Sequence, residues 1–550
     1  MAPFFNKKNL FFLTLLVGFF LSVSISLYLG NSVLDLPNFN HSKKLKNNSQ
    51  IQFAINRIYN PDKRLICQFN FPSDCFIQYT TDGSDPSING KKLLGNQLQA
   101  NALPAVIPQL GSYVNSLHWR PGILDWNVRL VRAICIKPSK LEVSNEQQLI
   151  LTNESNTKNN LPIVSICFDA SSYSDFFSGI GVLGFSQHYT PLKAWWDQLG
   201  NFSYRGKKNK KESTFSIFNY PNSINSAYGE FAISGNASRA FPKKSYSFEF
   251  KSSSPFSGVK LINNNEICSA IILRSGSNDW NKAIIRDAYA EDLAQSIFKQ
   301  DSRGVMPAIL FLNGEYFGLY FVYPKLNKTT LANKYKVSEG DVLFWEEGNF
   351  KNDFSQKEIN ILQDKLRSNK INVKDKIRII EEEIDLINFY RYVAFNQFLS
   401  NVDWPLGNNK MFKIKNQTKW KFVSNDLDIS MGVVDVETDA NLDCFKNFQE
   451  SNSIVPTLFI TLMKDSTKKN EFLNVFSELL KNNLSERIAL NKLDQLITRV
   501  RPHVLDHTLR WRSHSSVKEW EIQIQKIRRF IHLRSEFLEE YIIDERSASK

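Results

Sequence analysis

Four residues in the second half of the chain have the types and spacing needed for chemistry on phosphates. Asp403 and Asn408 keep an Asp-x4-Asn spacing, and Asp426 and Asp428 follow a strand-like run. In phosphoryl transfer, one carboxylate orients the attacking hydroxyl, while an asparagine and another carboxylate hold Mg²⁺ on the phosphates. The types and spacing of these residues are therefore compatible with phosphoryl transfer assisted by Mg²⁺.

Two other interpretations of the same residues remain open. Aspartate and asparagine are common turn residues, so one Asp-x4-Asn spacing is weak evidence by itself. The pair Asp426 and Asp428 could also belong to a carbohydrate hydrolase. Residues two apart on a strand share one face, however, and do not flank a bond from both sides as that mechanism requires. The hydrolase is therefore the weakest of the three interpretations.

A site of this kind also needs cations for the nucleotide. The glycine-containing turn around Arg239 leads into Lys244 and then into a predicted strand, so its amides and lysines could face phosphates. We expect Lys244 to contact the nucleotide and to pair with an acid of the following helix, Asp287 or Glu291. The alternatives are a hairpin with solvated lysines and an ordinary surface salt bridge.

The elements that must position these residues can be predicted from hydrophobic periodicity. Apolar residues at helical spacing predict one helix over residues 282–298, packed on a sheet, and a long helix over residues 376–400. Strand-like runs dominate between them and before them, and Asn313-Gly314 predicts a type I′ hairpin turn. From Pro456 onward the pattern is almost wholly helical. A β-rich lobe joined to an α-rich lobe, with a cleft between them, fits this order.

A separate β-rich unit precedes these lobes. Short apolar runs separated by turn clusters between residues 51 and 155 predict a small antiparallel sandwich of the immunoglobulin type. The segment Tyr79–Pro86, followed by Val131-Arg132-Ala133, resembles the chitobiase C-terminal module. This resemblance implies an accessory module rather than a catalytic one.

The N-terminus carries a long apolar segment. No charged residue occurs between Asn9 and Leu34, and about 20 apolar residues suffice to span a bilayer. We expect a single-pass membrane anchor, with a cleaved signal peptide as the alternative. Lys7 and Lys8 place the short N-terminus in the cytoplasm and the bulk of the chain outside it.

Composition limits the possible partners. The 550 residues carry 68 Lys and Arg against 55 Asp and Glu, a mild excess of +13. The densest basic run, Lys207–Lys211, is short and has no aromatic interleaving, so we expect a solvated loop and no nucleic-acid partner. Six widely spaced cysteines predict neither a zinc site nor a disulfide framework, although Cys67 and Cys75 could pair.

Five ordered segments resemble the CotH-type kinase family, which is named for spore coat protein H. The resemblance covers about residues 160–545 and includes a helical tail. It implies an atypical protein-kinase-like fold of two lobes that uses ATP and a divalent metal to phosphorylate Ser or Thr of a surface or coat protein. The segments are GNASRAFPKKSYSFEF, ILRSGSNDWNKAIIRDAYAEDLA, LFLNGEYFGLYFV, SNVDWPLGNN and WKFVSNDLDISMG.

The resemblance also assigns roles to individual residues. It implies that Asp403 is the catalytic-loop acid and that Asp426 is the principal metal ligand, assisted by Asp428 and by Asn408 or Asn409. It further implies a set of nucleotide-binding residues, which are Lys244, Arg239, Arg274, Arg286 and Asp287. Asp279 also matches a family position, but the sequence does not define its role.

The chain departs from the family pattern at one position. Pro324 stands where the family usually has an acidic residue after the second hairpin. If that carboxylate normally contributes to the nucleotide site, activity is in doubt here. The alternative to a membrane-anchored kinase is therefore a non-catalytic surface scaffold with a degenerate kinase-like cleft.

The overall expectation is an α+β chain of six segments. They are a membrane anchor or signal segment (1–34), a linker (35–50), an immunoglobulin-like sandwich (51–155), a β-rich lobe (160–330), a catalytic α-rich lobe (331–455) and a helical C-terminal region (456–550). Residues 325–375 are expected to form an insertion that covers the cleft.

Overall fold

The computed structural model describes most of the chain after residue 45. The described ranges are 46–47, 51–59, 65–107, 109–110, 119–122, 124, 126, 128–151, 161–186, 200–218, 224–251, 259–260, 267–348, 354–405, 407–450 and 453–547. The predicted anchor or signal segment and most of the linker lie outside these ranges. Within them, no helix is both long enough and apolar enough to cross a membrane.

The first folded unit consists of two sheets that share a hydrophobic core. One sheet has the order β1-β8-β7-β4-β5, with β9 beside β7, and the other has the order β2-β3-β6. Phe69, Ile77 and Val131 are buried in the core of this unit. The strands are β1 (Lys46–Asn47), β2 (Ala54–Tyr59), β3 (Leu65–Asn70), β4 (Phe76–Thr80), β5 (Lys91–Lys92), β6 (Gln97–Gln99), β7 (Arg129–Lys137), β8 (Glu142–Val143) and β9 (Gln147–Leu151).

This two-sheet arrangement agrees with the predicted sandwich, while its kinship with the chitobiase module stays a prediction. The Cys67–Cys75 bond, which the sequence left open as a possibility, is not formed, since all six cysteines are free thiols. Cys67 is buried in the core of the unit, where it packs as a small apolar side chain.

The middle of the chain folds into a closed barrel. Its order is β10-β11-β12-β13-β16-β18-β17, and β17 closes the barrel by pairing in parallel with β10. Alternate side chains, such as Ile166, Phe231 and Tyr320, fill the interior. The strands are β10 (Ile163–Phe168), β11 (Lys211–Phe218), β12 (Ile224–Ser234), β13 (Ser245–Phe250), β16 (Ala270–Arg274), β17 (Met306–Leu312) and β18 (Glu315–Pro324).

The turn between β17 and β18 confirms one sequence prediction. Asn313 and Gly314 both have positive φ, 48° and 77°, as a type I′ turn requires. The prediction for the helix after β16 is confirmed in part. Helix α4 runs over Arg286–Phe298, four residues later than predicted. Ten of its thirteen residues are buried, including Arg286 and Asp287, so it is enclosed rather than packed by one apolar face.

The long helix predicted over residues 376–400 is wrong, because two helices occupy this range. Helix α7 (Val373–Glu383) ends before Ile384, whose backbone is extended and pairs with Trp420. Asp385 then caps α8 (Leu386–Leu399) by accepting a hydrogen bond from the backbone of Asn388. A cap residue inside the apolar pattern thus divides the helix.

Residues 325–375 form part of the lobe rather than a covering insertion. They supply α5 (Lys328–Tyr335), β19 (Val342–Glu346), α6 (Phe354–Arg367) and the start of α7. Strand β19 pairs with β20 (Lys410–Ile414), which in turn pairs with β21 (Lys421–Val423). This small sheet therefore carries the segment that follows Asn408.

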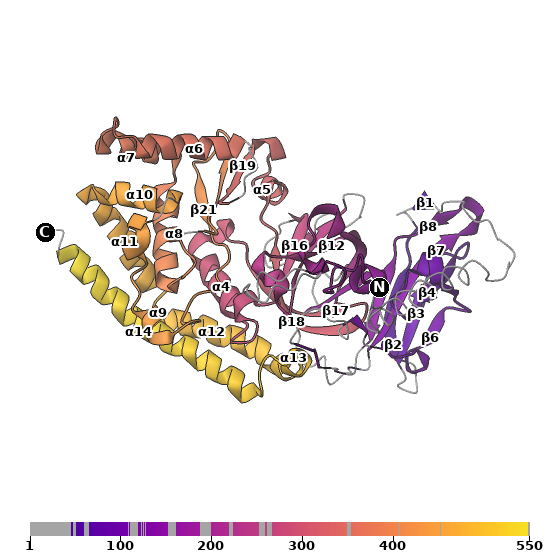
Figure 1. The fold of residues 1–550 in the computed structure, drawn as a ribbon. Coiled ribbons are helices and arrows are strands. Elements are labelled where there is room, and N and C mark those ends of the chain that lie inside the picture. The colour runs from indigo at the N-terminus through magenta and orange to yellow at the C-terminus, as the bar shows by residue number, and fades with distance from the viewer. Residues whose placement is uncertain are drawn as a thin grey trace, which may run out of the picture.

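The C-terminal region is helical, as predicted. Figure 1 shows the three parts in a row, with the barrel between the two-sheet unit and the helical lobe, and α14 running along the helical lobe. The helices are α9 (Val436–Ala440), α10 (Ile454–Met463), α11 (Ser466–Asn482), α12 (Glu486–Val500), α13 (Val504–Trp511) and α14 (Val517–Ser547).

Helix α13 joins the end of the chain to its beginning. Trp511 stacks on Trp119 with ring centroids 5.3 Å apart, and the Trp119 indole donates to the Trp511 carbonyl at 2.9 Å. Arg510 forms a buried ion pair of 2.6 Å with Glu315 of the barrel and donates to the carbonyl of Gly122 at 3.1 Å. The two-sheet unit, the barrel and α13 therefore share one interface.

Candidate functional site

Arg274 stands at the centre of three carboxylates, where the barrel meets the helical lobe. It is the last residue of β16. Its Nη2 donates to Asp426 at 2.6 Å and to Asp428 at 3.5 Å, and its Nε lies 3.1 Å from Asp287 of α4. We refer to Arg274, Asp287, Asp426 and Asp428 as the Arg274 cluster.

The carboxylates of the Arg274 cluster are fixed by further hydrogen bonds. Asp428 Oδ2 accepts from the backbone and side-chain nitrogens of Asn278 at 2.7 and 2.8 Å. Asp287 accepts from the backbone of Leu427 at 2.9 Å and from the Tyr323 hydroxyl at 2.7 Å. These bonds tie the Asp426–Asp428 segment to α4 and to the barrel.

Charge within the cluster is unbalanced, since one guanidinium faces three carboxylates. Burial alone would raise the pKa of Asp426, but the charge and hydrogen bond of Arg274 lower it to about 2. Burial, and then the charge of Asp426, raises the pKa of Asp428 well above its usual range. The Asp426 side chain is 39% exposed, whereas Asp428 is 3% exposed. Asp426 therefore presents its charge to solvent.

Asp403 faces the same space from the loop after α8. The Val402 amide donates to the Ile429 carbonyl at 3.0 Å, which holds this loop against the segment that contains Asp426. Partial burial, and then the negative charge of Asp426, raises the pKa of Asp403. Asp403 is itself exposed, so its carboxylate can reach a substrate.

The two candidate asparagines have different roles. The Asn409 amide donates to Glu347 at 2.5 Å and to the Pro405 carbonyl at 3.0 Å, and its oxygen accepts from the Tyr392 hydroxyl at 2.7 Å. These bonds occupy Asn409 in holding the loop. Asn408 is half-buried with φ of 64°, and remains the candidate metal ligand.

Lys244 does not reach the carboxylates. Its ammonium donates to the carbonyls of Arg239 and Phe241 at 2.8 and 3.0 Å and lies 4.1 Å from the centre of the Phe202 ring. Burial lowers the pKa of Lys244 to about 7. The turn before β13 directs this side chain under the loop, so the expected pairing with Asp287 is made by Arg274 instead.

The other acid proposed as a partner for Lys244 also has a different partner. Glu291 of α4 pairs with Arg303 at 2.9 Å. Arg303 lies over the Tyr323 ring, 5.1 Å from its centre. An arginine from outside the predicted turn thus pairs with each of the two helix acids.

Two of the predicted nucleotide-binding arginines serve the scaffold. Arg239 donates to the carbonyls of Gly235, Phe202 and Tyr204 at 2.6, 3.2 and 3.1 Å. Arg286 forms an ion pair with Asp279, and both side chains are fully buried. Neither guanidinium contacts the carboxylates around Arg274, so Arg274 is the one predicted cation that the structure brings to them.

Lys410 is a candidate that the sequence analysis missed. It pairs with Glu346 at 2.7 Å and contributes to lowering the pKa of Asp426, so its charge acts on the cluster. Burial lowers the pKa of Lys410 itself. Its position directly after Asn409 was the available signal. Asn278 was likewise missed, although it lies next to Asp279 in a predicted motif.

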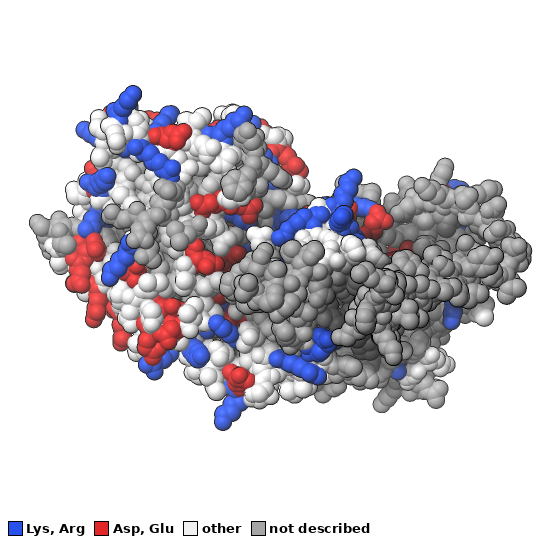
Figure 2. Space-filling view, viewed as in Figure 1, with Lys and Arg blue, Asp and Glu red and all other residues white. Residues whose placement is uncertain are grey.

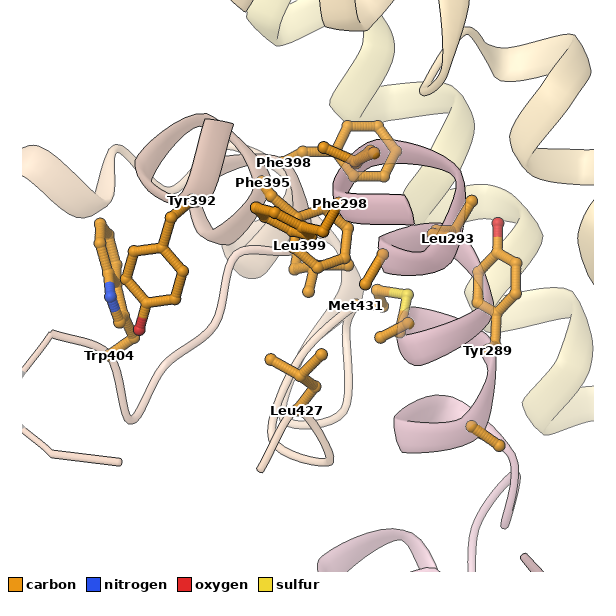
Figure 3. Close-up of a cluster of buried hydrophobic side chains, with 14 of the residues drawn as sticks. Tyr289, Leu293, Phe298, Tyr392, Phe395, Phe398, Leu399, Trp404, Leu427 and Met431 are labelled. Carbon is orange, nitrogen blue, oxygen red and sulfur yellow. The ribbon is translucent and has the colours of Figure 1, made fainter. Parts of the chain in front are cut away.

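A hydrophobic core supports the acidic residues. Figure 3 shows Leu427 and Met431 of the loop on one side of α4, with side chains of α8 nearby. Tyr289 extends from the other side of α4, where its hydroxyl donates to the Ala489 carbonyl at 2.7 Å. Leu427 is 1% exposed and lies between Asp426 and Asp428 in the sequence. Its burial forces the two flanking aspartates toward the surface of this core. The packing thus positions the carboxylates on α4 and on the Leu427 loop.

The described part of one face of the molecule carries charges of both signs. Figure 2 shows Lys and Arg scattered among acidic side chains there, with no continuous basic stripe. This distribution agrees with the mild net charge of +13.

Comparison with known proteins places the site within a family. The family model described as CotH kinase protein matches residues 231–538, which include every residue of the Arg274 cluster and Asp403. No curated protein matches the chain.

One similar solved structure is the crystal structure of a Helicobacter pylori proinflammatory kinase, CtkA. It has 11% sequence identity and a TM-score of 0.20, with 64% of this chain and 96% of that chain covered. Likeness at this level carries no argument about function.

Proposed function

Because the chain belongs to the CotH kinase family, we propose that it is a protein kinase that transfers the γ-phosphoryl group of ATP to a Ser or Thr hydroxyl. The observation that carries the proposal is the Arg274 cluster with Asp403 beside it. A buried guanidinium, a partly exposed Asp426 and a separate exposed acid are the parts that phosphoryl transfer uses for phosphate, metal and acceptor.

The donor set fits Mg²⁺ or Mn²⁺. All candidate ligands are oxygens, from Asp426, Asp428 and Asn408. Among the described residues, no three His, Cys, Asp or Glu side chains form a complete metal site. Two carboxylates and one amide oxygen suit Mg²⁺, which usually takes one or two protein carboxylates and completes its shell with water and substrate phosphates. Bound there, the ion would neutralise charge on the phosphates.

The residues of the chain divide the remaining work. Asp403 accepts a hydrogen bond from the acceptor hydroxyl, aligns it with the γ-phosphorus, and takes its proton as the new O–P bond forms and ADP leaves. Arg274 turns part of its guanidinium toward the phosphates, where a planar fork binds two oxygens. Asn278 holds Asp428 in place.

We further propose that the protein is anchored in a membrane, with its catalytic part outside the cytoplasm. The support is the uncharged segment from Asn9 to Leu34 and the lysines before it. The acceptor would then be a surface or coat protein. Secretion after cleavage of the segment is the alternative.

A non-catalytic scaffold is the second candidate function. Two observations favour it: Lys244 is turned away from the carboxylates, and Arg274 is already paired with them. Pro324, which breaks the family pattern, is the last residue of β18 and pairs with Ile271 of β16. In this case, the acidic cluster would be structural.

A thermal-shift titration separates the two functions. The full chain in detergent is titrated with ATP and Mg²⁺ or Mn²⁺, and a ligand at about 100 times its Kd stabilises the folded state by about 2.7 kcal/mol. We expect a metal-dependent rise in Tm that Asp426→Ala abolishes and that Asp494→Ala, at a surface pair with Arg528, retains. A folded chain without a shift in either metal would support the scaffold.

Transfer itself needs a second readout. Radiolabelled γ-phosphate should appear on the chain or on an added protein only when Asp403 and Asp426 are both intact. If nucleotide binds but no phosphate is transferred, the assignment of the nucleotide site stands and the proposed kinase activity is wrong.

A further inference from the structure

Three exposed phenylalanines lie together on the loop after α3 (Ser171–Ser174), outside the candidate active site. Phe176, Phe177 and Phe185 are 57%, 65% and 67% exposed. Their rings contact in sequence, with centroids 5.1 Å apart for the first pair and 5.7 Å for Phe177 and Phe185. Single exposed apolar residues need no explanation, but a contiguous group of large rings marks an interaction surface.

The backbone that presents these rings is well fixed. The Asp175 carboxylate accepts from the Phe177 amide at 2.9 Å. The Phe176 carbonyl accepts from the Phe185 amide at 2.8 Å and from the Asn201 side chain at 2.9 Å. The exposure of the rings is therefore built into the loop.

A basic segment shares this surface. Tyr204 donates its hydroxyl to the Phe177 carbonyl at 3.0 Å, and the Lys208 ammonium lies 5.5 Å from the centre of the Tyr204 ring. Lys211 donates to the Ser178 carbonyl of the aromatic loop at 3.0 Å. The exposed members of the basic segment are Arg205, Lys207 and Lys208.

The charge of this surface is positive. Lys207 and Lys208 form no ion pair with any residue that the structure describes, whereas Lys210 is held by Glu230 and Glu249. The nearby acids are already engaged, since Asp175 binds its own loop and Glu212 pairs with Lys251 at 2.7 Å. Exposed rings thus stand beside uncompensated ammonium groups.

We propose that this aromatic–basic surface, formed by Phe176, Phe177, Phe185, Lys207 and Lys208, docks on an anionic lipid bilayer. Aromatic side chains favour the membrane interface, and basic residues next to it are attracted to anionic headgroups. The combination of both on one rigid surface fits lipid better than a purely polar or purely apolar partner. The proposal concerns how the barrel sits on a membrane; it rests on the proposed membrane anchor and does not depend on phosphoryl transfer.

The length of the preceding chain allows this contact. The apolar segment ends at Leu34, and the first described strand begins at Lys46. The residues between them can extend about 40 Å at most. An anchored chain therefore keeps the two-sheet unit and the adjoining barrel close to the lipid surface, where the docking equilibrium is intramolecular.

The test uses the full chain in lipid nanodiscs with an environment-sensitive dye on Ser178→Cys. This position is exposed and leaves all three rings in place, and Cys75→Ser removes the most accessible native thiol. In nanodiscs with 30% anionic phosphatidylglycerol, dye emission should shift to the blue and spin-labelled lipid should quench it. In pure phosphatidylcholine, both effects should be weaker. The same dye on Ile361→Cys, 55% exposed on α6, is the matched control and should show neither effect.

Two sets of variants identify the contact. Lys207→Glu with Lys208→Glu should reduce the ratio of docked to undocked chain at least about fivefold for each lysine in anionic discs. Phe177→Ser with Phe185→Ser should abolish quenching, with Tm unchanged because the rings are exposed. A blue shift already present in detergent would mean that another part of the chain covers the rings. Each of three results would overturn the proposal: a blue shift in detergent, quenching that is independent of lipid charge, or no quenching.

Discussion

Two arginine–aspartate groups, the Arg286–Asp279 pair and the Arg274 cluster, have different environments. Arg286 and Asp279 form an ion pair with no solvent exposure, and Asp279 also accepts from the Ala283 and Arg286 amides at 3.0 Å each. Arg274 instead faces three carboxylates, one of which is 39% exposed. The first group is neutral and closed, whereas the second has an excess of negative charge and an opening to solvent.

This difference separates a structural ion pair from a candidate active site. A buried pair with matched charge has nothing left to bind, and its removal exposes a bare charge to the core. A cluster with surplus carboxylates is costly alone and is relieved by a cation. The balance of charge within a group and the solvent exposure of its carboxylates therefore indicate function better than the distance between the charged atoms does.

The largest expected effect comes from breaking the closed pair. Asp279→Asn leaves the Arg286 charge uncompensated and should lower the free energy of unfolding by about 3–5 kcal/mol. Denaturant unfolding monitored by tryptophan fluorescence measures it. The control is Asp375→Asn, whose exposed pair with Arg378 is 3.7 Å long, and a change below about 1 kcal/mol is expected there. Equal effects at both sites would remove the distinction between the pairs.

Breaking the open cluster should affect activity and leave stability almost intact. Asp426→Asn removes the exposed metal-ligand candidate, and transfer should fall by at least about 100-fold. The Tm should fall only slightly, because the Asp426 side chain is 39% exposed and Arg274 keeps Asp287 and Asp428 as partners. Initial rates at saturating ATP and a thermal melt on the same sample test both points. A large loss of Tm would place Asp426 with Asp279 as a structural acid.

A third substitution tests whether the guanidinium of Arg274 binds phosphate. Arg274→Lys keeps the charge but loses the planar fork, so the KM for ATP should rise about 10- to 100-fold with a smaller change in kcat. Rates over a range of ATP concentrations separate the two constants. A fall in kcat alone, with KM unchanged, would indicate that Arg274 positions the acids rather than the nucleotide.

The smallest effect is expected at a pair of intermediate exposure. Lys410 and Glu346 are 17% and 38% exposed, and Glu346→Gln frees a positive charge near Asp426. Stability should change by less than about 1 kcal/mol, while the KM for ATP falls about two- to threefold. Glu383→Gln is the matched control, because Lys413 on the same strand pairs with Glu383 at 2.9 Å. An equal fall in KM there would mean a general charge effect.

Local patterns predicted much of this molecule. The Asn313-Gly314 turn, the helix ending at Phe298 and the helical C-terminus depend on residues near in sequence, and each was found. Asp403, Asp426 and Asp428 were proposed from the Asp-x4-Asn spacing, from the strand-like run before Asp426 and from the resemblance to the CotH-type family. Closure of the barrel by β10 and β17 depends on pairing between distant strands, which periodicity does not encode.

The errors arose where a side chain had several partners within reach. Lys244 was expected at the phosphates because of its type, yet the turn beneath it supplies two carbonyls at closer range. Arg274 lies 152 residues from Asp426 in sequence, so no spacing could reveal their contact. Asp385 interrupts a continuous apolar pattern, and its role as a cap depends on the extended backbone at Ile384.

The interface of α13 with Trp119 and Glu315 also constrains biosynthesis. The indole of Trp119 donates to the carbonyl of Trp511, which lies 392 residues later in the chain. Contacts between distant segments are slow to form. During synthesis, the apolar surface around Trp119 therefore stays uncovered until α13 has been made. Premature termination before Arg510 should therefore yield a product that chaperones retain and proteases degrade, even though its barrel sequence is complete.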